Sequence, residues 1–370
     1  MLPRLRGLVT AGAGLLRANV APLARPLKVN LCVTYWCQYR CQTCNIWKRR
    51  PEHELTTDEL LTFVDKNDHT AWLDVTGGEI FLREDIGEIL LAVALGWSRL
   101  GVLHFPTNGF LTDKIVAVTT RIAQTRRVPI VVTVSLDGHE ALNDKIRGIK
   151  GGYQRQVATL CALRQIPGVR ATLGMTLSSL NIDQIQATFE ACQRDCTGLS
   201  IDDFHLNVAQ RSAHYYDNAG QTAFEAGTDQ LRSEIKLYRK RRSWSGAPSD
   251  VVEQLYLRHL DRFLSTGQTP MACHALRSSC FVDPWGTVYP CITYSKPIGS
   301  LRETGMDIGP IWTAQLARHT QREIWRGECP QCWTACEAYQ SILGNALAPW
   351  RWRSQSVRGP MPVPSEHQRP

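Results

Sequence analysis

Residues 29–47 read VNLCVTYWCQYRCQTCNIW, and this stretch joins an apolar run to a tight group of cysteines. The run over residues 26–36 is apolar and rich in β-branched side chains, which predicts a buried strand. Cys37, Cys41 and Cys44 follow it with the spacing C-x3-C-x2-C. Such a group is a zinc site short of one ligand, an incomplete disulfide set, or a metal site that keeps one coordination position open.

The composition is that of an ordinary globular chain. Of 370 residues, 43% are hydrophobic and 21% are charged, enough for one large domain and a smaller one. Thirteen cysteines are an odd number and many are clustered, unlike a secreted disulfide scaffold, so we expect a reducing, cytoplasmic location. The cysteines outside the tight clusters are Cys32, Cys161, Cys192, Cys196 and Cys280, and we expect Cys192 and Cys196 to be core residues of one helix.

The net charge of +8 is concentrated at the two ends of the chain. Residues 1–28 hold five basic residues and no acid, and residues 351–370 hold four arginines and one glutamate, so the body is neutral. This distribution disfavours a basic nucleic-acid groove. Residues 1–25 predict a basic amphipathic helix, too short and interrupted to span a bilayer. It packs on the body, lies peripherally at the inner face of a membrane, or is a secretory signal.

Apolar runs alternate with helical patterns along residues 26–210. The predicted strands are 26–36, 71–79, 102–109, 128–138, 171–179 and 201–210, and the predicted helices between them are 56–66, 83–97, 111–125, 152–165 and 183–196. Strands with near-continuous apolar character, separated by helices, predict a parallel sheet that is buried on both faces. Six such units predict an α/β fold with a partial (β/α)6 barrel of the TIM type, whose chemistry lies at the C-terminal ends of the strands.

Unusual polar motifs follow the predicted strands. Gly77, Gly78 and Glu79 end the second strand, where a glycine pair lets a ligand approach the backbone and a carboxylate can hold an ammonium group. On the sixth strand, His205 and Asn207 share one face, either as satisfied interior groups or facing a substrate.

With the three-cysteine loop followed by the Gly-Gly-Glu motif, the sequence resembles the radical S-adenosylmethionine superfamily over about residues 28–345. The resemblance implies that Cys37, Cys41 and Cys44 hold a 4Fe-4S cluster whose open iron binds S-adenosylmethionine. One electron from a donor such as flavodoxin or ferredoxin then cleaves this molecule, and the resulting 5'-deoxyadenosyl radical abstracts a substrate hydrogen. The three cysteines are therefore the expected catalytic group.

The resemblance also assigns the contacts with S-adenosylmethionine. They are Gly77, Gly78 and Glu79 at the methionine amino group, Ser135 near the ligand, Arg147 at its carboxylate and Asn108 towards the ribose. Many members have an aromatic residue just before the third cysteine, whereas this chain has Thr43. Trp47 either supplies an adenine wall instead or packs in the core.

The C-terminal part carries a second group of cysteines. After a connecting helical region at 226–268, residues 269–345 resemble the SPASM/twitch domains, which hold auxiliary iron-sulfur clusters, and a basic, proline-rich tail follows at 346–370. We expect one auxiliary 4Fe-4S cluster on Cys273, Cys291, Cys329 and Cys332, with Cys280 and Cys336 as alternates and a second cluster as an alternative. Four thiolates also suit a structural zinc site.

The predicted function is hydrogen abstraction that leads to oxidation or rearrangement of a small-molecule, sugar or lipid-linked substrate. A first alternative is a maturase of a ribosomally made peptide. An alternative of a different class is a non-catalytic zinc or iron-sulfur module that binds RNA through the basic ends of the chain.

Overall fold

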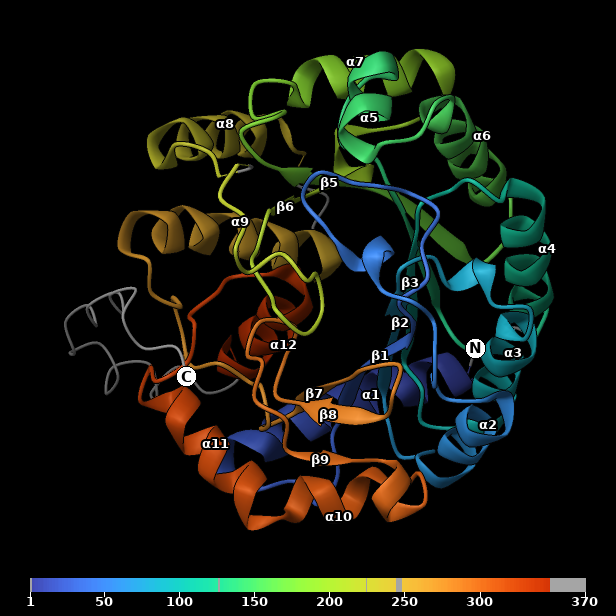
Figure 1. The fold of residues 1–370 in the computed structure, drawn as a ribbon, viewed down its shortest axis with the longest axis vertical. Coiled ribbons are helices and arrows are strands. Elements are labelled where there is room, and N and C mark those ends of the chain that lie inside the picture. The colour runs from blue at the N-terminus through green and yellow to red at the C-terminus, as the bar shows by residue number, and fades with distance from the viewer. Residues whose placement is uncertain (1, 126, 224, 244–247, 347–370) are drawn as a thin grey trace.

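The computed structural model describes residues 2–125, 127–223, 225–243 and 248–346 (Figure 1). Within them, one nine-stranded sheet runs in the order β6-β5-β4-β3-β2-β1-β7-β8-β9. The strands are β1 (Lys28–Thr34), β2 (Trp72–Gly77), β3 (Val102–Thr107), β4 (Ile130–Ser135), β5 (Val169–Leu177), β6 (Phe204–Val208), β7 (Ser279–Val282), β8 (Thr287–Tyr289) and β9 (Gly299–Ser300).

The six predicted strands are confirmed as β1 to β6, and each pairs in parallel with its neighbour in the chain. Helices cover the outer face of this curved sheet (Figure 1). These are α2 (Thr57–Lys66), α3 (Ile86–Gly96), α4 (Thr112–Ala123), α5 (Glu140–Arg147), α6 (Gly152–Arg164) and α7 (Ile185–Asp195). The predicted partial barrel is therefore present. The short helix α5 was not predicted.

The alternation of side chains along the strands separates an apolar outer layer from a polar interior. In β3, β4 and β6, buried side chains alternate with partly exposed ones. At the base of the interior, the Lys28 ammonium lies 2.8 Å from the Asp74 carboxylate, and His104 Nδ1 lies 3.0 Å from the same carboxylate. Because both charges are buried, removing either one would leave the other unpaired and would lower the stability of the fold.

The open side of the barrel is closed by α8 (Thr228–Arg241), α9 (Pro248–Thr266) and α12 (Ala335–Ala346). His205 Nδ1 lies 3.0 Å from the Glu253 carboxylate of α9, and Tyr256 of the same helix donates a hydrogen bond to Asn207. The two polar side chains of β6 therefore face the interior and have partners there.

The C-terminal part extends the barrel sheet. Strand β7 pairs in parallel with β1, and β8 and β9 continue from it in antiparallel pairs. The remaining helices are α10 (Ile308–Thr313) and α11 (Gln315–Trp325), with short 3-10 turns η1 (Ile46–Lys48), η2 (Ile80–Leu82), η3 (Ile201–Asp203) and η4 (Arg302–Thr304). The β7–β8 hairpin thus lies directly beside the strand that leads into the three cysteines.

The N-terminal helix α1 (Leu2–Val20) packs on the body, one of the three interpretations of its sequence. Leu15 and Ala18 are buried, and Asn19 donates a 2.6 Å hydrogen bond to the carbonyl of Gly344 in α12. Its outward face exposes Val9 and Val20. None of the helices in the described ranges is both long and apolar enough to cross a membrane. The predicted basic tail lies outside the described residues from residue 347 onward.

The isolated cysteines show one pairing that the sequence did not reveal. Cys192 and Cys196 are buried core residues, as predicted. Cys196 is also paired with Cys161 of α6 in a disulfide.

Candidate active site

The three-cysteine loop leaves the end of β1 and returns through η1 at the C-terminal rim of the barrel. Cys37, Cys41 and Cys44 are all partly buried. Burial and the neighbouring Cys41 thiol raise the pKa of Cys37 to about 12. Burial and the same neighbour also raise the pKa of Cys44. Three thiols that destabilise one another's charge need a cation or a metal to hold them as thiolates.

The glycine pair at the end of β2 is required by the loop itself. A Cβ atom on Gly77 would overlap the carbonyl of Thr34, and one on Gly78 would overlap the carbonyl of Trp36. The backbone amide of Gly78 donates to the Thr34 carbonyl at 2.9 Å. The glycine pair was predicted to let a ligand approach the backbone. In the structure, the backbone at the start of the three-cysteine loop makes this close approach instead.

Glu79 is completely buried beside that loop. Its carboxylate accepts hydrogen bonds from the Asn108 amide at 2.6 Å, the Phe81 amide at 3.2 Å and the Thr107 hydroxyl. Burial outweighs these bonds and raises its pKa to about 7. Asn108, held in this way, directs its side-chain amide to within 3.9 Å of the Cys37 sulfur. The second and third strand ends therefore meet at the first cysteine.

Arg147, at the end of α5, is a buried cation beside the loop. Its guanidinium lies 2.6 Å from the Asp137 carboxylate, and its carbonyl accepts from the Arg40 amide at 3.1 Å. Its charge opposes the effect of burial on the pKa of Cys41. The Arg147 Nε atom is buried without a hydrogen-bond partner, which suits a carboxylate ligand. Ser135 lies partly exposed at the end of β4.

The second group of cysteines divides into four that are linked by effects of one thiol on the pKa of another and two without such a link. Burial is the largest cause that raises the pKa values of Cys273, Cys291 and Cys332. Neighbouring cysteine thiols also raise these pKa values, and for Cys332 one such neighbour is Cys329. Cys280 is fully buried in β7, and its pKa is raised by burial and Glu337 without a cysteine neighbour. These effects favour the four cysteines preferred from the sequence, whose role as joint ligands stays a prediction.

Cys336, the second alternate, faces a different environment. Burial raises its pKa to about 12, while the ammonium of Lys28 opposes this. Its side chain packs against the apolar group that contains Tyr215 and Phe281, and Cys37 and Cys44 pack against the same group. It therefore lies towards the barrel interior and the first cysteine loop.

The segment that follows β6 connects the two groups of cysteines. Residues 212–218 follow β6, and the Tyr216 carbonyl accepts from the Asn45 amide at 2.8 Å. On the other side, His214 Nε2 lies 3.0 Å from the Cys291 carbonyl. The only sequence signal was the aromatic run around Tyr215, which did not reveal these contacts.

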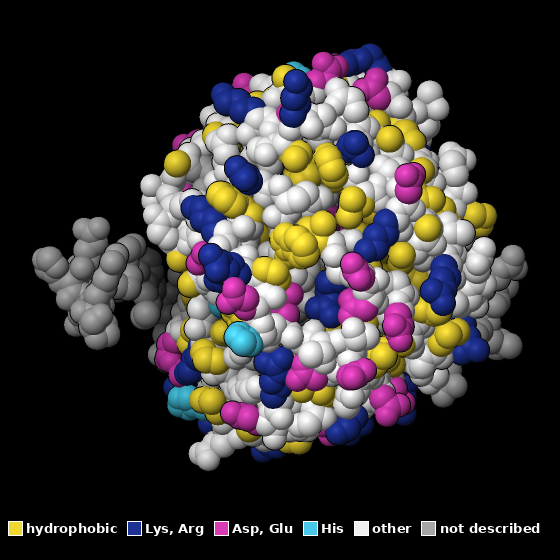
Figure 2. Space-filling view, turned by 45° about the vertical axis from the view of Figure 1, so that its right-hand side comes forward, with side chains coloured by type: hydrophobic (Ala, Val, Ile, Leu, Met, Phe, Trp, Pro, Cys, Tyr) yellow, Lys and Arg dark blue, Asp and Glu magenta, His cyan; other side chains and the backbone are white. Residues whose placement is uncertain are grey.

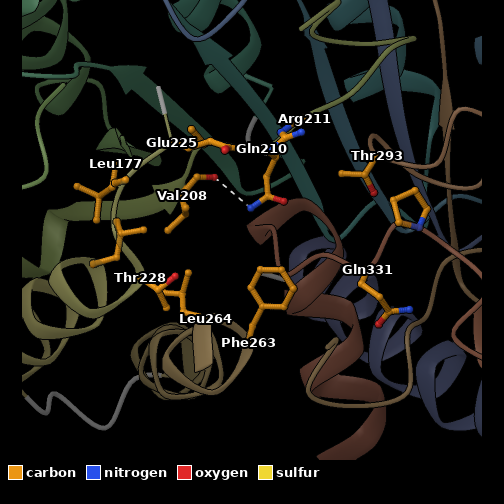
Figure 3. A pocket seen from close by; sticks show the side chains of 14 residues that line it. Leu177, Val208, Gln210, Arg211, Glu225, Thr228, Phe263, Leu264, Thr293 and Gln331 are labelled. Atoms are coloured by element: carbon orange, nitrogen blue, oxygen red, sulfur yellow. Dashed lines mark hydrogen bonds and ion pairs between the residues drawn. The ribbon is translucent and has the colours of Figure 1, made fainter. Parts of the chain in front are cut away.

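A pocket of about 530 Å³ lies at the rim, beyond β5 and β6 (Figure 3). Leu177, Val208, Phe263 and Leu264 line one part of it, and Thr293 and Gln331 line the part beside the second cysteine group. Arg211 and Glu225 form an ion pair at its edge. An occupant of this pocket contacts the strand ends and the Cys329–Cys332 turn together.

Both cysteine groups are all-thiol donor sets, which suit iron-sulfur clusters. In the described part of the chain, no three Cys, His, Asp or Glu side chains converge on a position for a single metal ion. The buried Arg147 beside Cys41 adds a cation that favours bound thiolates and a bound carboxylate. The residues present therefore fit a cluster with S-adenosylmethionine at the first group and a second cluster at the other.

Comparisons with known proteins agree with this chemistry. Residues 273–336 match the family described as SPASM: Iron-sulfur cluster-binding domain. The sporulation killing factor maturation protein SkfB of Bacillus subtilis is 22% identical over 288 residues, which is 77% of this chain and 65% of the relative. The pre-heme d1 synthase of Dinoroseobacter shibae is 29% identical over 302 residues, which is 74% of this chain and 68% of the relative. The chain thus spans about two thirds of the length of these relatives.

Solved structures share the fold. Streptococcus suis SuiB bound to S-adenosylmethionine superposes with a TM-score of 0.60 at 15% identity, over 84% of this chain and 70% of that one. The structure of anSMEcpe with bound AdoMet and a peptide named Kp18Cys superposes with a TM-score of 0.60 at 12% identity, over 88% of this chain and 98% of that one.

The three-cysteine loop and the match of residues 273–336 to the SPASM iron-sulfur cluster-binding domain agree with the resemblance of this chain to radical S-adenosylmethionine proteins of the SPASM type. Its cofactors are a 4Fe-4S cluster with S-adenosylmethionine and auxiliary iron-sulfur binding in the SPASM domain. A 4Fe-4S cluster with S-adenosylmethionine at Cys37, Cys41 and Cys44 would supply a carbon radical able to abstract hydrogen.

Proposed function

We propose that this chain is a radical S-adenosylmethionine enzyme that modifies a peptide. The sequence by itself favoured a small-molecule, sugar or lipid-linked substrate, with a peptide maturase as the alternative. The names of SkfB and of the subtilosin biosynthesis protein AlbA, 23% identical over 82% of this chain, support the alternative better. So does the solved structure of Streptococcus suis SuiB bound to the precursor peptide SuiA.

The observation that carries the proposal is the pocket at the barrel rim. Its 530 Å³ accommodates a few side chains of an extended peptide, with apolar walls and polar groups at the edge. Gln210 and the Arg211–Glu225 pair offer hydrogen bonds to a peptide backbone. Thr293 and Gln331 place the occupant beside the auxiliary cysteines.

In this proposal each group of residues has a separate task. Cys37, Cys41 and Cys44 hold the first cluster, and Arg147, oriented by Asp137, binds the carboxylate of S-adenosylmethionine. Glu79 holds the turn at Asn108 against the loop and provides negative charge for an ammonium group. Gly77, Gly78 and Ser135 line the space between them.

The four cysteines Cys273, Cys291, Cys329 and Cys332 hold the auxiliary cluster in this proposal. Its place beside the pocket allows it to accept the electron that remains on the substrate after hydrogen abstraction. The net reaction is then an oxidation of the peptide, such as a crosslink or a dehydrogenation.

A second candidate is a tetrapyrrole-type small-molecule substrate, because the pre-heme d1 synthase has the higher identity of 29%. The two candidates make different demands on the pocket. A peptide needs an open edge with backbone partners, whereas a tetrapyrrole needs cations for its carboxylates, and Arg211 in the pocket lining is already paired with Glu225.

The deciding experiment follows deuterium into 5'-deoxyadenosine. The anaerobically reconstituted protein is reduced and mixed with deuterated cell extract that is divided into a peptide fraction and a small-molecule fraction. We expect transfer from the peptide fraction, and no transfer with the Cys41→Ala variant. Transfer from the small-molecule fraction alone would contradict the peptide substrate. A protein that binds zinc only, and never cleaves S-adenosylmethionine, would contradict the enzyme itself.

A further inference from the structure

The three-cysteine loop has two sides with different surroundings. Through Asn45 it contacts the 212–218 segment, which leads to the auxiliary cysteines. On the other side, the Gln42 amide donates to the Ile146 carbonyl at 2.9 Å, and the Gln42 side chain donates to the Lys145 carbonyl at 3.0 Å. The end of α5 is thus attached to the loop beside Cys41.

Exposed cations gather on this second side. Arg40 and Lys48 lie 5.6 Å and 5.3 Å from the Trp47 ring and so flank it. Lys145 and Lys150 extend the charge from the end of α5, where Gly148 is packed against the Arg40 carbonyl. We call the set of Arg40, Trp47, Lys48, Lys145 and Lys150 the loop basic patch. Its four cations are all exposed.

Acidic side chains nearby are already engaged elsewhere. The Asp144 carboxylate accepts from the backbone amides of Gly151 and Tyr153 at 2.5 Å and 2.8 Å. Asp137 is paired with Arg147, Asp217 with Arg49 and Glu52 with Arg50. Among the described residues, the four patch cations have no ion-pair partner, so the patch presents a positive field to the solvent.

This charge is local. The body of the chain is neutral overall, and Figure 2 shows acidic side chains mixed with basic ones over much of one face. Two cations that flank the Trp47 ring, with two more at the adjoining end of α5, are therefore a feature of this region rather than of the surface in general.

We propose that the loop basic patch is the docking surface for the electron donor, an acidic one-electron carrier protein of the flavodoxin or ferredoxin type. The first cluster must receive its electron from outside, and Cys41 lies between Arg40 and Gln42 at the edge of the patch. A positive surface steers an acidic donor to this edge, and one central aromatic ring suits a small, transient interface. One electron leaves the donor and enters the cluster, with no bond made or broken.

The patch and the substrate pocket use separate residues. The pocket is lined from β5, β6, α8, α9 and the auxiliary cysteine segments, and none of its lining residues belongs to the patch. Donor and substrate would therefore contact different residues of the chain. The inference depends on the first cluster and is independent of the substrate.

The test measures reduction of the reconstituted protein by reduced flavodoxin in an anaerobic stopped-flow instrument, followed by flavin absorbance. The variants are Lys145→Glu, Lys150→Glu and the double variant, all outside the three-cysteine loop. Lys240→Glu on α8, an exposed lysine in a different place, is the matched control. Each protein is also reduced with dithionite, a small reductant that needs no docking surface.

At low salt we expect the double variant to lower the flavodoxin rate at least about tenfold, because charge steering sets association rates. The difference should shrink at about 0.5 M salt, where screening is strong. The rates of reduction by dithionite should stay within about twofold of wild type, because this reductant needs no docking surface. The flavodoxin rate of the Lys240→Glu control should also stay within about twofold, because Lys240 lies outside the patch.

Three results would overturn the proposal. An unchanged flavodoxin rate would remove the docking surface. An equal fall with dithionite would mean that the charge reversals damage the cluster instead. Weaker binding of a polyglutamate peptide with an unchanged flavodoxin rate would make the patch a peptide site. Failure of peptide modification would leave this measurement intact.

Discussion

His214 Nε2 lies 3.0 Å from the carbonyl oxygen of Cys291, and the ring stacks on Tyr289 at 4.2 Å. On the other side, the His214 carbonyl accepts from Tyr35 at 2.7 Å and from Arg49 at 2.6 Å. One residue thus joins the segment after β1 to the turn that carries an auxiliary cysteine. The relative position of the two cysteine groups depends on this junction.

Replacing His214 by Phe keeps the stack on Tyr289 and removes the bond to Cys291. We expect a loss of about 1–3 kcal/mol in the free energy of unfolding. A changed electron paramagnetic resonance spectrum of the auxiliary cluster, at unchanged iron content, would show that the junction positions Cys291. A matched control is Tyr153→Phe, which removes a hydroxyl that donates to Asp195 in a distant part of the barrel.

The same histidine predicts a pH dependence. Burial lowers the pKa of His214 to about 4, below its ordinary value of 6.5. Because the unfolded chain binds the proton more tightly, the contribution of His214 is complete above pH 6.5 and is lost as the pH falls towards 4. Unfolding of the cofactor-free protein by denaturant at pH 7 and pH 5 measures this. The wild type should lose more stability than His214→Phe between the two values, and equal losses would contradict the assignment.

The glycine at the end of β2 allows a matched pair of variants. Gly78→Ala places a Cβ against the Trp36 carbonyl, so the loop must shift, and we expect a loss of about 2 kcal/mol or more in stability. S-adenosylmethionine cleavage should fall with it. Gly96→Ala, with nothing within 4 Å of its added Cβ at the end of α3, should be neutral or stabilise by up to about 1 kcal/mol. Equal effects of the two would contradict a steric role.

The cysteine grouping predicts which thiols bind iron. Replacing Cys332 with Ala should remove about four irons of a reconstituted chain and the spectrum of one cluster. Replacing Cys280 should leave iron content unchanged, because its side chain is fully buried within β7 and no other thiol contributes to its raised pKa. Iron analysis with Mössbauer spectroscopy checks this. Loss of iron in Cys280→Ala, or in Cys336→Ala, would place that alternate among the ligands.

The buried pair at the base of the barrel predicts a large, asymmetric effect. Asp74→Asn leaves the fully buried Lys28 ammonium without its partner and should cost about 3–5 kcal/mol in stability. Replacing both by apolar residues should cost less, since no charge then stays unpaired. Glu52→Gln, which breaks the exposed pair with Arg50, should change stability by less than about 0.5 kcal/mol. Thermal or denaturant unfolding measures all three.

Much of the barrel was predictable because its signals are local. Each apolar run between helical patterns became a strand of the parallel sheet, and Thr56 caps α2 with Glu59 in a reciprocal capping box. The short α5 was missed because eight residues with few apolar positions are too short a stretch to establish a helix from the sequence. That miss matters, since α5 ends at Arg147 and supports one side of the three-cysteine loop.

The sequence by itself determined the chemistry of this protein: three cysteines after a buried strand, a glycine pair after the next, and a second cysteine group. These are matters of spacing along a few residues, which the chain order encodes directly. Only the tertiary structure decided which distant groups meet. The pairing of β7 with β1, the contact of His214 with Cys291 and the packing of Cys336 towards the first cysteine loop join residues far apart in the chain. Such contacts depend on how whole elements pack, and no local pattern specifies them.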